Sequence, residues 1–228
     1  MLNDSERFKQ PGLLRISLLL TAAVLLPGLC GCGLIITAGK MIMGESKSPS
    51  SFEQITGTKL SESKDRLLII CTAPHHVLVE FPSVQLELLD RISQNLERRE
   101  IQVVSPDDVA AWYDDHGEWG DYSELAEHFD AKYVAHVSLR TFSFLEPESN
   151  SLLRGRSEGT VRVYEIDRRN SVPVFKTFER DLRVKFPEIH PVPRESGSDD
   201  MFVNKLINRV ALQTSQLFHD HGLRETIF

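Results

Sequence analysis

The segment from Val172 to Phe186 alternates between apolar and polar side chains. Because successive side chains of a β-strand point to opposite faces, this alternation requires a sheet with one buried face and one face in water. The apolar series is Val174, Phe178, Leu182, Val184 and Phe186, and the polar series is Thr177, Glu179, Asp181, Arg183 and Lys185. Other parts of the chain must therefore form a layer that covers the apolar face.

A strand, a helix and a second strand are predicted upstream of this segment. The apolar run Leu67–Thr72 has the length of a strand buried on both faces, and Ile101–Val104 indicates another. Between them, after Pro82 and Ser83, apolar residues recur at helical spacing. They are Val84, Leu88, Leu89, Ile92 and Leu96. The three elements together have the size of a βαβ unit.

Further elements follow from caps, periodicity and turns. Ser105 and Pro106 are typical of a helix start, and this helix is expected to end near Tyr113. The remaining predicted elements are a short helix capped by Asp121 or Ser123, a strand Tyr133–Leu145 with a bulge near Phe142, a connection Glu146–Glu158, a strand Gly159–Asp167 and a last helix from Asp199 to about His219. The order β-α-β-α-α-β-β-β-α predicts an α/β (α+β) domain, a mixed β-sheet with helices packed on it.

The N-terminal region carries a different signal. Fourteen uncharged residues, from Ile16 to Leu29, follow a weakly basic start, and Leu29-Cys30-Gly31-Cys32 comes next. A basic end, a short apolar stretch and a small residue before a cleavage point are typical of a secretory signal. The four residues resemble a bacterial lipobox, which implies that residues 1–31 are removed and that Cys32 carries the lipid (palmitate) anchor.

Two alternatives to the lipoprotein signal remain open. The apolar run Ile16–Ala38 is long enough to cross a bilayer, so an uncleaved anchor helix could extend to about residue 43. Ordinary secretion with a cleaved signal peptide is the other. The lipoprotein and anchor hypotheses both place the domain on a membrane, in the cell envelope and facing away from the cytoplasm. We predict a flexible tether over 32–66, because 44–66 is rich in Ser, Lys, Glu and Gly, then a single domain over 67–220 and a tail over 221–228.

Charge and cysteine content exclude several classes of protein. The net charge of −7 argues against a nucleic-acid partner. Three cysteines are too few for a disulfide scaffold or a four-thiolate metal site. Cys71 lies in an apolar run and is expected to behave as a small buried hydrophobe.

The stretch Leu125–Val134 ends a helix in Phe129-Asp130-Ala131 and leads into an aliphatic strand. It resembles a motif of the bacterial envelope domains that include the N-terminal domain of TolB, LpoB and CsgG. His136 stands where those domains often have Gly. The resemblance covers about residues 65–220 and implies a domain that acts by binding protein partners. The apolar N-terminus, the Ser-rich segment and Leu152–Arg156 also resemble uncharacterised bacterial lipoproteins.

Candidate catalytic and metal-binding residues are sparse. The sequence has no P-loop, no dinucleotide-binding fingerprint, no HExxH and no Gly-x-Ser-x-Gly motif. His75-His76 and the pair His219 and His221 around Asp220 are the candidates for a metal-binding protein or a hydrolase. A helix C-terminus also favours cationic side chains such as these histidines. We therefore expect no cofactor, no metal site and no enzymatic activity.

A partner surface is predicted at two places. Trp112, Tyr113, Trp119 and Tyr122 are dense for a chain with 8% aromatic residues, and they would either pin two short helices together or contact a partner. Arg154 and Arg156 form a local basic region. The sequence thus favours a non-catalytic, membrane-anchored envelope lipoprotein that binds a protein partner or self-assembles as a homo-oligomer. An accessory subunit of an envelope transport or secretion complex is the alternative.

Overall fold

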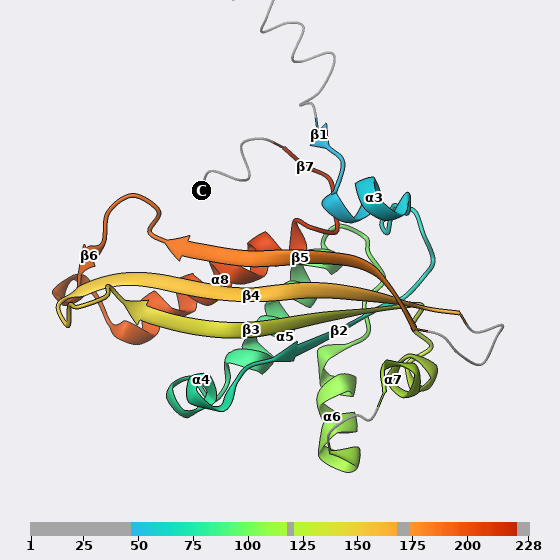
Figure 1. Ribbon diagram of the computed structural model, residues 1–228, viewed down its shortest axis with the longest axis horizontal. Helices are drawn as coiled ribbons and strands as arrows, with labels where there is room; N and C mark the ends of the chain where they lie inside the picture. Colours follow the sequence, from blue (N-terminus) through green and yellow to red (C-terminus); the bar gives the residue numbers. More distant parts are fainter. Residues whose placement is uncertain (1–46, 118–120, 168–173, 223–228) are drawn as a thin grey trace, which may run out of the picture. The chain divides into compact units, whose positions relative to one another are not determined.

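The computed structural model describes residues 47–117, 121–167 and 174–222 (Figure 1). The predicted signal or anchor helix and Cys32 lie outside these ranges. Within them, no helix is both long and apolar enough to pass through a bilayer.

The sheet is mixed, as the sequence predicts (Figure 1). In spatial order its main strands are β2 (Leu67–Thr72), β3 (Tyr133–Leu145), β4 (Leu152–Ile166) and β5 (Val174–Phe186). The pair β2–β3 is parallel, whereas β3–β4 and β4–β5 are antiparallel. The short strand β6 (Val192–Pro193) pairs with the start of β4. The predicted irregularity late in β3 is present as register shifts after Leu139 and Ser143.

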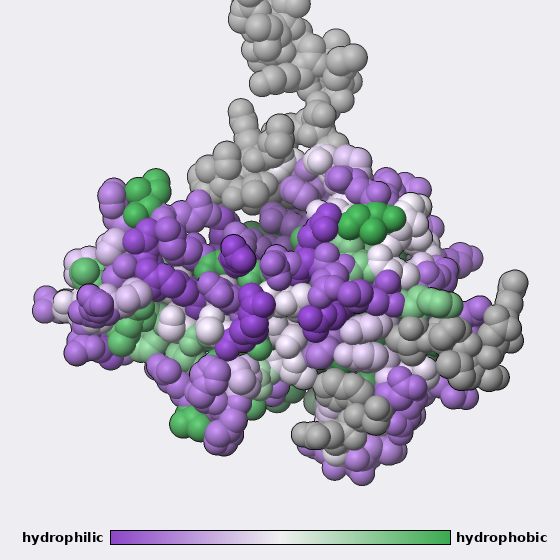
Figure 2. Space-filling model, viewed as in Figure 1, coloured by the Kyte–Doolittle hydropathy of each residue, from purple (hydrophilic) through white to green (hydrophobic). Residues whose placement is uncertain are grey.

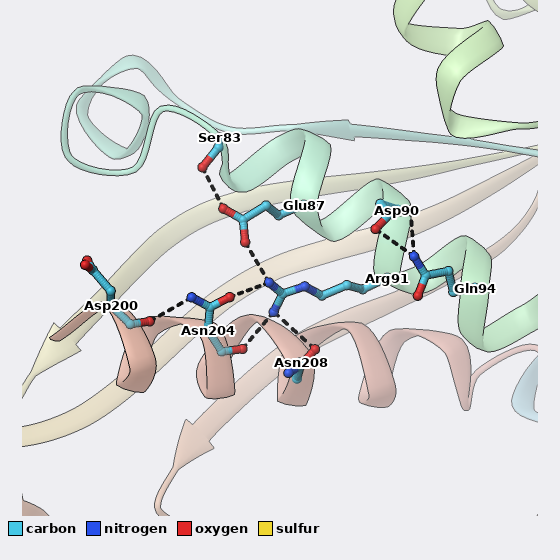
Figure 3. Close-up of polar contacts among 8 residues, drawn as sticks. All are labelled: Ser83, Glu87, Asp90, Arg91, Gln94, Asp200, Asn204 and Asn208. Carbon is cyan, nitrogen blue, oxygen red and sulfur yellow. Dashed lines mark hydrogen bonds and ion pairs between the residues drawn. The ribbon is translucent and has the colours of Figure 1, made fainter. Parts of the chain in front are cut away.

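Helices α5 (Val84–Glu97) and α8 (Asp199–Ser215) cover one face of this sheet (Figure 1). Arg91 on α5 fixes the two helices to each other (Figure 3). Its guanidinium donates to the Asn204 carbonyl at 2.7 Å, to the Asn204 side chain at 2.6 Å and to the Asn208 side chain at 3.1 Å. Glu87, one turn earlier on α5, accepts from the same guanidinium at 2.7 Å. The covering layer is therefore held in one register by polar contacts as well as by its apolar stripe.

The opposite face of β3–β5 faces water and is mostly hydrophilic (Figure 2). Along β5, Phe178, Leu182 and Val184 are 2–4% exposed, whereas Asp181 and Arg183 are exposed. The predicted division into a buried and a wet face is confirmed.

Three further helices are α4 (His75–Glu80), α6 (Pro106–His116) and α7 (Tyr122–His128). A 3₁₀ turn, η2 (Arg194–Ser196), precedes α8. The start of α6 at Pro106 matches the prediction, because Pro is favourable in the first helical turn. Segment 75–80, which follows Pro74, forms a short helix.

The predicted strand Ile101–Val104 does not form a ladder. It makes one parallel bridge, Leu67 with Val103, in which Leu67 N–H donates to the Gln102 carbonyl at 2.8 Å and Val104 N–H donates to the Leu67 carbonyl at 3.0 Å. The pairing ends there because α6 begins two residues later.

Strand β4 begins at Leu152, well inside the predicted connection Glu146–Glu158. Gly155 lies within this strand at a close contact, since a Cβ there would lie 2.6 Å from the Leu206 side chain of α8. This helix therefore packs closely on the sheet at this point.

Part of the predicted tether 32–66 is folded. The structure has β1 (Lys47–Ser48) and α3 (Ser51–Thr56), and the Ser50 hydroxyl caps α3 by accepting from the Glu53 N–H at 3.0 Å. Phe52 is fully buried, with its ring 5.5 to 5.8 Å from the rings of Tyr133, Phe178 and Phe218. Phe52 and the equally buried Leu60 thus anchor this polar stretch to the core.

The predicted C-terminal tail also begins with a paired segment. β7 (His221–Gly222) pairs antiparallel with β1. The folded unit therefore extends beyond the predicted limits of 67 and 220 at both ends.

Candidate functional site

A cleft of about 700 Å³ lies at the carboxyl end of β2 and is lined by residues of the α4–α5 segment and of α6. In open α/β sheets, ligands bind outside the carboxyl ends of parallel strands. We call it the α4–α6 cleft. Its lining includes Cys71, Thr72, Leu78, Leu86, Tyr113 and Asp114.

The walls of the α4–α6 cleft are largely apolar. Leu78 of α4 and Leu86 in the first turn of α5 line the cleft, and Leu86 is 57% exposed. Val79, the neighbour of Leu78 on α4, is 68% exposed. Asp114 supplies a carboxylate from α6 and is exposed. The cleft therefore offers apolar contact area next to a negative charge.

Two further groups of the cleft are held uncharged. Burial raises the pKa of the Cys71 thiol to about 12. Burial also raises the pKa of the Tyr113 phenol, and the proximity of Cys71 and Tyr122 raises it further. At neutral pH both groups are protonated, although Cys71 is only partly buried and lines the cleft, whereas the sequence predicted a buried side chain.

A chain of hydrogen bonds runs from the cleft to the wet face of the sheet. His136 on β3 contacts the Thr72 hydroxyl through Nε2 at 2.7 Å and the Tyr122 hydroxyl through Nδ1 at 2.8 Å. Tyr122 stacks on Tyr164 with ring centroids 4.2 Å apart. Burial, with a smaller effect of Arg162, lowers the pKa of His136 to about 4. A neutral imidazole satisfies both contacts because each hydroxyl can donate or accept.

This arrangement limits the chemistry of the site. Nucleophilic catalysis by a thiol requires the thiolate, and general base catalysis is most efficient with a pKa near the working pH. The pKa of Cys71 is too high for a thiolate at neutral pH, and the pKa of His136 is too low for an efficient general base. The cleft is better suited to contact and hydrogen bonding than to proton transfer.

The four predicted aromatic residues have different roles. Trp112 is 4% exposed and stacks on His116 at 4.7 Å, so it belongs to the core and not to a partner surface. Tyr113 lines the α4–α6 cleft, and Tyr122 belongs to the hydrogen-bond chain beside it. Trp119 lies outside the described residues.

Arg154 and Arg156 make contacts within the domain. Arg154 donates to the carbonyls of Glu188 and Ile189 at 2.8 and 3.0 Å, and Arg156 forms a two-pronged ion pair with Glu146 at 3.0 and 2.9 Å. Both lie near the start of β4, ten and eight residues from Tyr164, a separation of about 26 to 33 Å along a strand. They therefore do not join the aromatic residues in one surface.

The two histidine clusters lie apart from the cleft lining. His75 and His76 are exposed in the first turn of α4. His219 is 6% exposed, and its Nδ1 donates to the Asp220 carbonyl at 2.9 Å. In the described ranges, no group of three or more His, Cys, Asp or Glu side chains is placed to hold a metal ion.

Sequence reasoning did not identify His136 or the α4–α6 cleft as part of a site. His136 is an imidazole in the largely apolar start of β3, and such a residue needs hydrogen-bond partners when it is buried. That signal was present in the sequence. The cleft depends on how α4, α5 and α6 meet, and no local pattern carries that information.

Comparison with known proteins gives similarity to solved structures only. No family model and no curated protein matches the chain. A PelC dodecamer from Paraburkholderia phytofirmans is 11% identical, with 75% of this chain and 96% of that chain covered and a TM-score of 0.42. A lipoprotein from Neisseria meningitidis is 12% identical (66% and 98% covered, TM-score 0.36). A hypothetical protein from Chlamydia trachomatis is 16% identical (72% and 94% covered, TM-score 0.39). Similarity at this level supports no functional inference, and the resemblance to the TolB, LpoB and CsgG group stays a prediction.

Proposed function

We propose that this chain is a membrane-anchored binding protein of the bacterial envelope, without catalytic activity, and that a segment of a protein partner occupies the α4–α6 cleft. The anchor rests on the apolar run and on Leu29–Cys32. The chemistry of the α4–α6 cleft supports the binding role.

The exposed apolar side chains around the cleft support a protein partner. Leu86 lines the cleft and is more than half exposed, and an exposed apolar group beside a groove is typical of interaction sites. Asp114 adds a negative charge, on a protein whose net charge is −7. These features favour a partner segment with apolar side chains and a basic residue next to them.

The protonation states argue for binding over catalysis. A thiol with a pKa of about 12 and an imidazole with a pKa of about 4 can donate or accept hydrogen bonds, but neither is poised to exchange protons at neutral pH. A hydrolase or metalloprotein would need a different set of groups in this cleft.

The test uses two matched variants of the full-length protein. Leu86→Asp places a charge on the cleft wall, and Met201→Asp places one at a similarly exposed position, since the two residues are 57% and 50% exposed. Each is the third residue of its helix, α5 or α8, so the position of the new charge relative to the helix dipole is matched.

Partners are captured with wild-type protein and identified by mass spectrometry, and the affinity of each purified partner is measured for all three forms. We expect Leu86→Asp to weaken binding at least tenfold and Met201→Asp to leave it unchanged. Equal binding by the Leu86→Asp protein would refute the assignment of the cleft.

A further inference from the structure

Strand β5 is the last strand of the sheet. It pairs with β4 along one side, and no other described strand pairs with its second side. Edge strands with unpaired N–H and C=O groups tend to add a further strand. β5 is long, from Val174 to Phe186, and contains no proline. Among the described strands it is the most suitable place for a partner strand to bind.

Charges on the wet face of β5 follow a particular order. Glu179 and Asp181 come first and Arg183 and Lys185 follow, all on one face. Protective edge charges are commonly of one sign, often lysines, so that a second copy is repelled. This strand instead has two acidic residues followed by two basic ones. Such an order is complementary to itself when two copies run antiparallel.

Antiparallel pairing centred on Leu182 sets opposite charges together on the wet face of the strand. Opposite residues then have numbers that are symmetric about Leu182. On the wet face, Asp181 lies opposite Arg183 and Glu179 lies opposite Lys185. On the covered face, Leu182 meets Leu182 and Phe178 meets Phe186, whereas Arg180 meets Val184. The paired stretch of nine residues is about 30 Å long.

Neighbouring registers that keep the faces aligned are worse. Centring on Arg180 places Glu179 opposite Asp181 and Arg180 opposite itself, which sets like charges against each other. Centring on Asp181 places that carboxylate opposite its own copy. A pairing register shifted by one residue would place the apolar side chains of one copy on the wet face of the joined sheet.

The charged groups are available for pairing. The Asp181 and Arg183 side chains are 61% and 73% exposed, and they approach each other only to 4.0 Å within the strand. Lys185 has no ion-pair partner among the described residues. Glu179 binds Arg162 at 2.8 Å and Lys176 at 2.5 Å, and it is still 37% exposed.

We propose that two copies of this chain associate through antiparallel pairing of their β5 edges centred on Leu182, which joins their sheets. This surface is separate from the α4–α6 cleft, so the inference does not depend on the proposed function. The occupant is a second copy because the charge order is self-complementary.

Charge reversal with rescue tests the pairing. Full-length protein is purified in detergent, and its dimer dissociation constant is measured by sedimentation for Asp181→Arg, Arg183→Asp, the double variant, and Arg140→Asp. Arg140 is the control because it is 52% exposed on β3 and makes a similar contact, 4.0 Å from Glu158. Thermal denaturation of each variant checks that the fold is kept.

We expect each single reversal at 181 or 183 to weaken the dimer about tenfold, since two opposite-charge pairs become like-charge pairs. The double variant should return to within about threefold of wild type, and Arg140→Asp should have no effect. A wild-type monomer at all concentrations would refute the proposal, as would a dimer insensitive to the reversals. A tighter dimer for Asp181→Arg would refute the register in favour of Arg180, and failure of the double variant to recover would also contradict it.

Discussion

His136 makes the stability of the domain depend on pH. Its imidazole is partly buried between the Thr72 and Tyr122 hydroxyls, and its pKa is lowered from 6.5 to about 4. Between these values the unfolded chain binds more protons than the folded one, so the free energy of unfolding rises with pH. The stabilisation is complete above pH 6.5 and is lost as the pH falls toward 4. Such a pKa difference corresponds to roughly 3 kcal/mol, and we expect about 2 kcal/mol because solvent reaches part of the ring.

The assay is urea unfolding of the full-length protein from pH 4 to pH 7.5, for wild type and for His136→Gln. Glutamine does not titrate but retains a donor and an acceptor, so the difference between the two proteins isolates the imidazole from the other histidines. The advantage of wild type should shrink by about 2 kcal/mol as the pH falls from 7 to 4. A difference that stays constant with pH, or a His136 resonance that titrates near 6.5 in NMR, would refute the reasoning.

Three other predictions concern single side chains. Phe52→Ala should lower the free energy of unfolding by about 3 kcal/mol in urea titrations, because α3 is anchored by this buried ring; a loss below about 0.5 kcal/mol would mean that 47–66 behaves as the predicted tether. Gly159→Ala should cost about 2 kcal/mol, since a Cβ would lie 2.5 Å from the Ser138 carbonyl oxygen, whereas at Gly155 it would meet only the movable end of Leu206; equal costs at the two sites would contradict this. Cys71 should resist maleimide at pH 7.5 in the native protein and react fully in denaturant, as read by peptide mass spectrometry, and rapid native labelling would contradict its raised pKa.

Patterns within a single element were sufficient to predict much of the sheet and its covering helices. The alternation along β5, the limits of β3 and the start of α6 follow from side-chain period and capping, which depend on neighbours in the chain. For the same reason the mixed sheet with helices on it could be predicted. The burial of Phe52 could not, because its partners Tyr133, Phe178 and Phe218 are distant in sequence.

The candidate site shows the same limit. Tyr113 and Tyr122 were predicted from aromatic density, and both lie at or next to the cleft. The same aromatic density also predicted Trp112 as a partner residue, but its ring is buried against His116. Composition does not determine which side of a helix faces the core. Arg154 and Arg156 were expected to form a basic surface. In the structure the Glu146 carboxylate neutralises Arg156, and the Glu188 carbonyl accepts a hydrogen bond from Arg154.

The anchored state itself is tested most directly by the mass of the native N-terminal peptide, measured on protein recovered from membranes and from the soluble fraction. We expect the protein to be in the membrane fraction and to begin at an acylated Cys32. An intact N-terminus in the membrane fraction would replace the lipid with the apolar run Ile16–Ala38 as the anchor. Protein in the cytosol that still begins with an unmodified Met1 would contradict the proposed membrane anchoring.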